Sequence, residues 1–270
     1  MAKKKQIVEH YEAQYSGFSS DLYAGIRREV FGTDYGQNGW QTADEQDKLI
    51  EWLRPEAASR LLDVACGSGG PAIRIAELSG CMVTGVDINE KAVSEAKKAS
   101  REGRLEARAH FRVVDGTPDL PFVDGSFDGL TCIDAVNHLP DREAVFSEWS
   151  RVLRPGGRLA ITDPVVIAGP VTDEEIRIRS SIGFFVFVPP GLDESLLEAA
   201  GFRIGSVTDV TENMARIADR WRRARGKRET ALREIEGSET FEGQQEFFKT
   251  AAKLAAERRL TRSLILAEKA

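Results

Sequence analysis

The stretch LLDVACGSGG, residues 61–70, decides the fold of this 270-residue chain. A short apolar run ends in the acid Asp63, and small residues and glycines follow at once. Gly67, Gly69 and Ala72 fit the spacing G-x-G-x-x-G/A of a strand-to-helix turn that holds a dinucleotide. The same turn can hold a nucleoside-type ligand, or it can simply connect a strand to a helix. The turn alone does not distinguish between a dinucleotide site, a nucleoside site and a plain connection.

Strand and helix patterns alternate on both sides of this turn. Short apolar runs that predict strands occur at 60–65, 81–87, 109–115, 127–134 and 157–163. Helical patterns lie between them at 71–80, 89–103 and 141–153. Strands that alternate with helices of this length predict βαβ units and a parallel sheet covered on both faces. The expected fold class is therefore α/β with a doubly wound sheet.

The remainder of the chain predicts a helical cap on this core. The expected division is an N-terminal helical cap or lid at 1–55, a core at 56–211, a helical cap insertion at 212–260 and a final core strand at 261–270. Thr42 and Glu45 have the spacing of a capping box at the start of a helix over 43–53. In the insertion, arginines and glutamates interleave, which predicts a solvated helical cap rather than a nucleic-acid surface.

Composition limits the class of protein. The chain is 41% hydrophobic and 30% charged, and its formal net charge of −6 argues against nucleic acid or an anionic membrane as a partner. Three cysteines without CxxC spacing indicate neither a disulfide framework nor a zinc site, and we expect no metal. The sequence has no apolar run of transmembrane length, and we expect no secretory signal. We expect a soluble cytoplasmic protein, either a monomer or a homodimer.

Asp87 narrows the choice of ligand for the turn. It ends the strand run at 81–87 and lies twenty residues after Gly67. A carboxylate at this place can accept hydrogen bonds from both hydroxyls of a ribose. The structural alternative is that Asp87 helps Asn89 to start the following helix. Both NAD and S-adenosylmethionine stay open as ligands at this point.

Asp115 and Gly116 follow the third strand run, where an acid can accept from an adenine amino group and a glycine lets the backbone approach the ring. Taken together, the ordered motifs resemble those of class I S-adenosylmethionine-dependent methyltransferases. The segments that carry the resemblance are D-V-A-C-G-S-G-G (63–70), G-V-D-I (85–88), D-G-T-P-D-L-P-F (115–122), S-F-D (126–128) and L-R-P-G-G-R-L (153–159). The resemblance implies a Rossmann-like sheet of seven strands with the last strand antiparallel, S-adenosylmethionine as cofactor, and transfer of a methyl group rather than a hydride.

The resemblance also assigns binding roles to residues of this sequence. It places Asp63, Ala65, Gly67 and Gly69 at the methionine end of the cofactor, Asp87 at the ribose, Ile88 on one face of the adenine, and Asp115 and Gly116 at the adenine edge. The end of the fourth strand run puts Asp134 and His138 at the mouth of the cofactor pocket. Cys66 departs from the family pattern, which often has glycine there. Since nothing basic flanks it, we expect Cys66 to be a small buried thiol.

A closer resemblance concerns the methyl acceptor. V-F-G-T-D-Y-G-Q-N-G-W-Q-T (30–42), Asp134 with His138 four positions on, and I-T-D-P (161–164) look like the N-methyltransferases that act on phosphoethanolamine, sarcosine and dimethylglycine. The resemblance implies that Asp134, His138 and an early tyrosine gate the site and help to deprotonate an amine. We assign this tyrosine to Tyr15, and Tyr23 stays open as the alternative because it also lies near the expected place in the sequence. The structural alternative for His138 is that it caps or packs against the helix that follows it.

The acceptor atom divides the remaining hypotheses. A small amine is the first expectation, and a C- or O-methyltransferase of small-molecule secondary metabolism or of lipid-like acceptors is the alternative. An apolar aromatic lining would favour the alternative, whereas acids within an aromatic cage would favour the amine. A hypothesis of another class is a non-catalytic module that binds S-adenosylmethionine without turnover.

Overall fold

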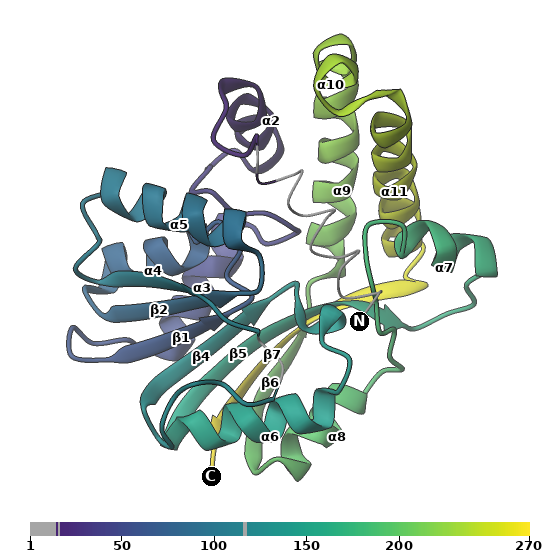
Figure 1. The fold of residues 1–270 in the computed structure, drawn as a ribbon. Coiled ribbons are helices and arrows are strands. Elements are labelled where there is room, and N and C mark those ends of the chain that lie inside the picture. Colours follow the sequence, from purple (N-terminus) through teal and green to yellow (C-terminus); the bar gives the residue numbers. More distant parts are fainter. Residues whose placement is uncertain (1–14, 16, 116–117) are drawn as a thin grey trace.

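A computed structural model describes residue 15 and residues 17–115 and 118–270 (Figure 1). Within these residues the strands form a seven-stranded sheet in the order β3-β2-β1-β4-β5-β7-β6. The strands are β1 Arg60–Val64, β2 Met82–Asp87, β3 Ala109–Val113, β4 Phe127–Ile133, β5 Leu153–Ile167, β6 Phe202–Asp209 and β7 Leu260–Lys269. β7 runs antiparallel between β5 and β6, and the pairings from β3 to β5 are parallel. The predicted doubly wound fold with an antiparallel last strand is confirmed.

Helices cover both faces of the sheet (Figure 1). One face carries α3 Ala43–Leu53, α4 Gly70–Ser79 and α5 Glu90–Glu102, and the other carries α6 Arg142–Val152 and α8 Leu192–Ala199. Strands in such a sheet must be apolar on both sides, which explains why β5 is buried without interruption from Leu159 to Val166.

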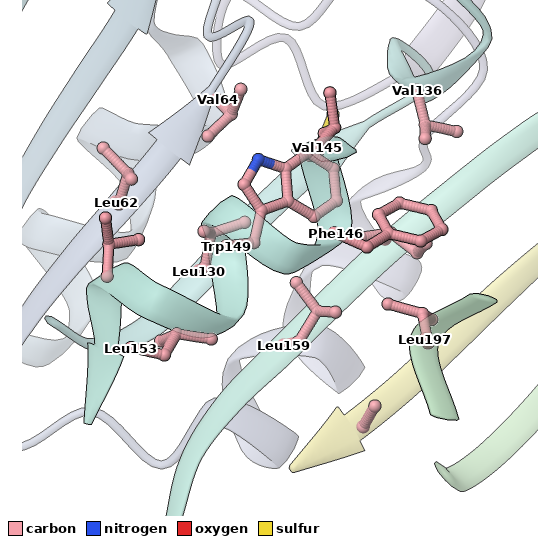
Figure 2. Packing of buried hydrophobic residues seen from close by; sticks show 14 of the residues in the cluster. Leu62, Val64, Leu130, Val136, Val145, Phe146, Trp149, Leu153, Leu159 and Leu197 are labelled. Atoms are coloured by element: carbon pink, nitrogen blue, oxygen red, sulfur yellow. The ribbon is translucent and has the colours of Figure 1, made fainter. Parts of the chain in front are cut away.

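The packing of α6 shows how one of these faces is closed. Trp149 and Phe146 are fully buried and lie in one cluster with Leu62, Leu130 and Leu159 from three neighbouring strands (Figure 2). Each such buried side chain stabilises the fold by about 1.5–3 kcal/mol. The carboxyl ends of β1, β4 and β5 are therefore supported by a rigid apolar layer.

The predicted helix starts are confirmed. Thr42 and Glu45 form both hydrogen bonds of a capping box at α3, and the Asn89 side chain accepts from the Ala92 N–H at the start of α5. One end differs from the prediction. The strand was predicted to begin at residue 157, but β5 begins at Leu153, directly after α6, and includes Pro155-Gly156-Gly157.

A second group of helices stands at the edge where β1, β2 and β4 end (Figure 1). It contains α2 Asp21–Phe31, α7 Asp173–Arg179, α9 Thr211–Gly226, α10 Glu229–Glu236 and α11 Ser238–Ala256. The apolar cluster of these helices also includes Val165 of β5 and Leu260 of β7. The division of the chain into cap and core stays a prediction. Among the described helices, none is long and apolar enough to cross a membrane.

Candidate functional site

Three strand ends meet at one edge of the sheet and bring the predicted cofactor residues together. β1 lies between β2 and β4 in the sheet, and the three strands are parallel. Their ends therefore place the turn after Val64, Asp87 and Asp134 side by side. Asp134 has φ 54°, a left-handed conformation that is uncommon for a residue other than glycine. Backbone of this kind gathers at functional sites.

The glycine turn is held by close backbone approaches. Gly69 has φ 78°, and a Cβ atom there would lie 2.7 Å from the Phe111 ring. A Cβ atom on Gly70 would lie 2.4 Å from the Tyr35 carbonyl oxygen. Only glycine fits such contacts, since a side chain would displace backbone on the facing loop. The turn is therefore fixed against β3 and the loop at 35–36.

Asp87 holds the turn from the end of β2. Its carboxylate accepts from the Gly67 N–H at 2.9 Å and from the Asn89 N–H at 2.8 Å. Removal of water from around this carboxylate raises its pKa. The structural role expected for Asp87 at Asn89 is therefore present. Its position beside the turn also fits the predicted contact with ribose hydroxyls.

Asp63 is buried at the end of β1, under the turn. It accepts a hydrogen bond from Thr131 Oγ1 at 2.7 Å. Burial raises the pKa of Asp63 to about 7, against the hydrogen bond from Thr131, which lowers it. Cys66 is also buried, and burial raises the pKa of its thiol, as expected for an inert core cysteine.

The other predicted cofactor residues lie along the same edge. Ala65 has φ 57° at the first position of the turn. Ile88 directly follows β2, and Asp115 lies just past β3; both are half-buried. Gly116 lies outside the described residues. The glycine cradle and the row of carboxylates fit S-adenosylmethionine, with Asp87 at the ribose and the turn at the methionine end.

Tyr15 lies against this turn and is not among the residues that line the cavity beside Asp134 and His138 described below. A Cβ atom on Gly67 would lie 2.5 Å from the Tyr15 hydroxyl, and Tyr15 is buried. Tyr23 instead lines the cavity, where its hydroxyl donates to Glu236 Oε2 at 3.0 Å and burial raises its pKa to about 12. Tyr15 and Tyr23, the two candidates for the early tyrosine, therefore occupy different parts of the site.

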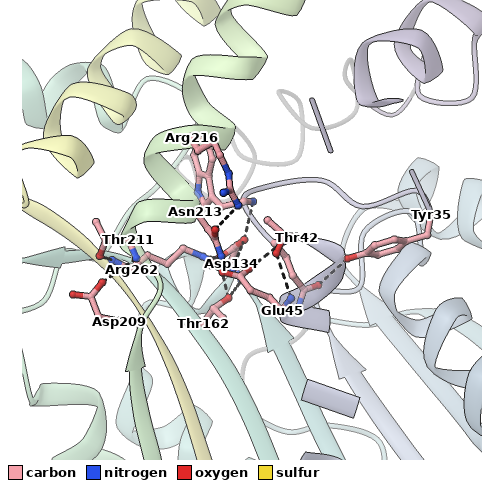
Figure 3. A network of polar contacts seen from close by, with 12 residues as sticks. Tyr35, Thr42, Glu45, Asp134, Thr162, Asp209, Thr211, Asn213, Arg216 and Arg262 are labelled. Carbon is pink, nitrogen blue, oxygen red and sulfur yellow. Dashed lines mark hydrogen bonds and ion pairs between the residues drawn. The ribbon is translucent and has the colours of Figure 1, made fainter. Parts of the chain in front are cut away.

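Asp134 is tied into a buried ion pair (Figure 3). Its carboxylate accepts from Arg262 Nε at 2.6 Å, from the Trp40 N–H at 2.9 Å and from Thr162 Oγ1 at 2.8 Å. Both of its oxygens therefore have donors within the chain. This arrangement fits a residue that fixes the end of β4, and the proton-transfer role expected for Asp134 stays a prediction.

Arg262 was not singled out from the sequence, yet it links four elements of the site. From β7 it pairs with Asp134 and also donates to Glu45 of α3 at 2.8 and 3.0 Å. Asn213 of α9 donates to the same Glu45 carboxylate at 2.7 Å. The neighbouring carboxylates raise the pKa of the Arg262 guanidinium, although burial opposes them. The one available signal was an arginine within an apolar strand run.

His138 lies in a 3-10 turn, Val136–His138, just after Asp134. Its Nδ1 lies 2.8 Å from the Phe184 carbonyl oxygen, and because a carbonyl can only accept, Nδ1 carries the proton. When the ring is neutral, Nε2 is then its basic nitrogen. The Asp141 side chain caps α6 by accepting from the Ala144 N–H. The alternative in which His138 caps this helix is therefore wrong.

A strap at 184–188 holds the turn that carries His138. The Val186 N–H donates to the Asn137 carbonyl at 2.8 Å, and Arg142 Nη2 donates to the Val186 carbonyl at 2.9 Å. Arg142 is itself clamped by Asp163 at 2.6 Å and by Asp193. Asp163 also accepts from the Val165 N–H at 2.9 Å and is fully buried, so it supports the strap rather than reaching a ligand.

A cavity of 570 Å³ opens beside His138 and Asp134. Its aromatic and aliphatic lining comprises Phe18, Tyr23, Trp40, Ile182, Phe185, Trp221, Ile235, Phe247 and Phe248. The Arg179 guanidinium lies over the Phe247 ring, 4.6 Å from its centroid. Among the described lining residues the acids are Asp134 and Glu236, and Glu236 is ion-paired with Arg225. The cavity is thus mostly apolar, and both of its acids are already paired with arginines.

A metal site is a separate question. Within the described residues, no group of three or more His, Cys, Asp or Glu side chains could hold a metal ion.

The fold and the cofactor edge define an S-adenosylmethionine-dependent methyltransferase, and comparisons with known proteins agree. The family model described as Methyltransferase domain matches residues 62–161. A 27-O-demethylrifamycin SV methyltransferase of Amycolatopsis mediterranei is 34% identical over 241 residues, which cover 83% of this chain and 86% of that protein. The chain therefore belongs to the S-adenosylmethionine-dependent methyltransferases and is a small-molecule methyltransferase.

Two further matches extend the comparison. The O-methyltransferase cnsE of Penicillium expansum is 34% identical over 166 residues, or 60% of this chain and 58% of that protein. The solved phosphoethanolamine N-methyltransferase 2 of Haemonchus contortus, in complex with phosphomonomethylethanolamine and S-adenosylhomocysteine, superposes with a TM-score of 0.78 at 21% identity, over 96% of this chain and 60% of that one. At that identity the solved structure shows a shared fold.

Proposed function

We propose that this methyltransferase transfers a methyl group to a hydroxyl oxygen of a largely apolar small molecule, with His138 as general base. One observation carries the proposal: the His138 imidazole lines the cavity while its Nδ1 proton is directed at the Phe184 carbonyl. A hydroxyl must lose its proton to attack, and a neutral imidazole with a basic Nε2 is suited to accept it near neutral pH.

The chain's own groups have defined tasks in this reaction. S-Adenosylmethionine supplies the methyl group when it is bound at the cofactor edge. The acceptor hydroxyl passes its proton to Nε2 of His138, and the Phe184 carbonyl stabilises the imidazolium through its hydrogen bond to Nδ1. The aromatic walls exclude water, which strengthens these electrostatic interactions.

The acceptor class is inferred from the lining of the cavity. A volume of 570 Å³ lies within the range of about 300–1,000 Å³ typical of small-molecule sites. An ammonium would have to compete with Arg262 for Asp134 and with Arg225 for Glu236. The names of two relatives, 27-O-demethylrifamycin SV methyltransferase and O-methyltransferase cnsE, also favour an oxygen acceptor. The small amine expected first from the sequence stays the alternative.

The test offers the purified protein and S-adenosylmethionine two sets of acceptors. One set holds hydroxylated apolar compounds, including 27-O-demethylrifamycin SV and simple phenols; the other holds phosphoethanolamine, sarcosine and dimethylglycine. Mass spectrometry measures the added methyl group, and NMR identifies the atom that carries it. We expect O-methylation in the first set and none in the second. N-methylation of the amines without an O-methylated product would overturn the proposal.

A further inference from the structure

The carboxamide of Asn137 is the feature of the cavity that the proposed reaction does not use. Asn137 lines the cavity and is 1% exposed. Among the described residues, neither its side-chain oxygen nor its nitrogen has a hydrogen-bond partner. A buried polar group left in this state destabilises the fold, so native proteins rarely retain one without a reason.

The backbone of Asn137 is fixed, which makes this state a property of the site. Its carbonyl accepts from the Val186 N–H at 2.8 Å, and Arg142 holds the Val186 carbonyl at 2.9 Å. The 3-10 turn that contains Asn137 also contains His138. The strap thus presents the carboxamide and the imidazole together on one wall of the cavity.

We propose that Asn137 determines acceptor specificity by binding, with both carboxamide atoms, a polar group next to the hydroxyl that is methylated. This inference rests on the proposed function. The carboxamide nitrogen donates and its oxygen accepts, so the complementary group contains an acceptor and a donor side by side. A carboxamide, or a carbonyl beside a second hydroxyl, has this arrangement. Because Asn137 is next to His138, the group lies close to the reacting oxygen.

This complementarity separates the natural acceptor from plain apolar molecules. A site built to hydrogen-bond a polar group rejects an analogue without it, since the buried carboxamide then stays unpaired. Phenol has the reacting hydroxyl alone, whereas salicylamide has a carboxamide beside its hydroxyl. Salicylamide and phenol are therefore suitable probes of Asn137.

The first arm of the test needs no acceptor. Asn137→Leu replaces the carboxamide with an apolar side chain of similar shape, and we expect the unfolding temperature to rise by about 2–4 °C. The matched control is Asn213→Leu, because Asn213 donates to Glu45 at 2.7 Å and accepts from Arg216 at 2.6 Å. The control should lower the unfolding temperature. A lower temperature for Asn137→Leu would overturn the proposal, because it would mean that the carboxamide has a structural partner.

The second arm measures binding by NMR in the presence of S-adenosylhomocysteine. The protein is labelled with ¹⁵N at asparagine, and the Asn137 side-chain signals are identified by their loss in Asn137→Leu. We expect salicylamide to shift these signals and to bind about tenfold more tightly than phenol, with the difference lost in Asn137→Leu. Equal affinity of both probes, no salicylamide binding, or weaker S-adenosylhomocysteine binding by Asn137→Leu would each overturn it. Failure of the proposed function is recognised separately, from the position of the transferred methyl group.

Discussion

The cofactor edge of the sheet and the acceptor cavity beside it are built from different kinds of contact. At the edge, the turn at 65–69 and Asp87 come from one βαβ unit, and they meet where the backbone Gly67 N–H donates to the Asp87 carboxylate at 2.9 Å. The cavity wall joins side chains from α2, the end of β4, α7, α9 and α11. Its two acids are held by ion pairs, Asp134 with Arg262 and Glu236 with Arg225.

This difference in construction suits the two regions to different roles. The glycines and the Asp87 carboxylate fix the shape of the turn where we expect the cofactor to bind. Side chains on separate helices form the acceptor site, so its shape and polarity can change without disturbing the edge. We therefore expect substitutions at the edge to alter cofactor binding, and substitutions in the wall to alter stability or acceptor choice.

The largest expected effect on stability comes from a substitution that removes the ion pairs between the two regions. Arg262→Met leaves Asp134 and Glu45 as buried charges without their arginine, and we expect it to lower the free energy of unfolding by about 3–5 kcal/mol. Urea denaturation measures this change. Arg258→Met is the control, because the exposed Arg258–Asp209 pair should contribute less than about 1 kcal/mol. Similar losses for both variants would contradict the role of the buried network.

The next effect concerns the pH dependence of the protein's stability, to which Asp63 at the cofactor edge contributes. Burial raises the pKa of Asp63 to about 7 in the folded state, above its value of about 3.9 when unfolded. Its neutral form therefore favours the fold below about pH 4, and this contribution is lost as the pH rises to 7. We expect Asp63→Asn to flatten the fall in stability between pH 4 and 7 by up to about 1.4 kcal/mol per pH unit.

Chemical denaturation at several pH values checks this expectation. A slope that remains in Asp63→Asn is assigned to Asp163, whose pKa burial also raises despite Arg142. An unchanged slope between pH 4 and 7 would show that Asp63 is not a buried neutral acid.

Asp87 tests the cofactor edge directly. Asp87→Ala removes the proposed ribose contact and the support of the Gly67 N–H, so we expect S-adenosylhomocysteine binding to weaken by about 1–3 kcal/mol. Isothermal titration calorimetry measures the affinity. Gln244→Ala, in the cavity wall, is the matched control and should leave this affinity unchanged. Equal losses in the two variants would remove the distinction between edge and wall.

The smallest effect compares two glycines. Gly243 lies in α11 with open space around the place of a Cβ atom, so Gly243→Ala should stabilise the protein by about 0.5–1 kcal/mol. Gly69→Ala should do the opposite, because its Cβ atom would meet Phe111 and Ala96 at a φ of 78°. Thermal unfolding of both variants measures the contrast. Stabilisation by Gly69→Ala would contradict the close approach at the turn.

The fold and the cofactor edge could be predicted because their signals are local. Strand runs, the Thr42 and Asn89 caps and the glycine spacing each depend on a few consecutive residues, and Gly67 and Asp87 lie in one βαβ unit. The topology of such units is restricted, so these local signals also predicted a parallel sheet covered on both faces.

The acceptor site could be predicted only in part because its contacts join residues far apart in the chain. His138 was expected at the end of β4, but the strap residue Phe184 that fixes its proton lies in a segment without a distinctive pattern. Arg262 and Glu45 meet only when β7 joins the sheet. Asn137 stood beside His138 in the sequence, but its buried and unpaired state depends on the packing around it.

The measurement that tests the account most directly compares His138→Gln with the wild-type enzyme, using the hydroxyl acceptor found in the screen. Glutamine keeps a donor for the Phe184 carbonyl but cannot accept the proton. We predict that turnover falls by about 10²–10⁴-fold, while S-adenosylhomocysteine affinity, measured by calorimetry, stays within about twofold, below a change of 0.5 kcal/mol. Turnover that survives the substitution would contradict the assignment of His138 as the base and leave it a residue of the cavity wall.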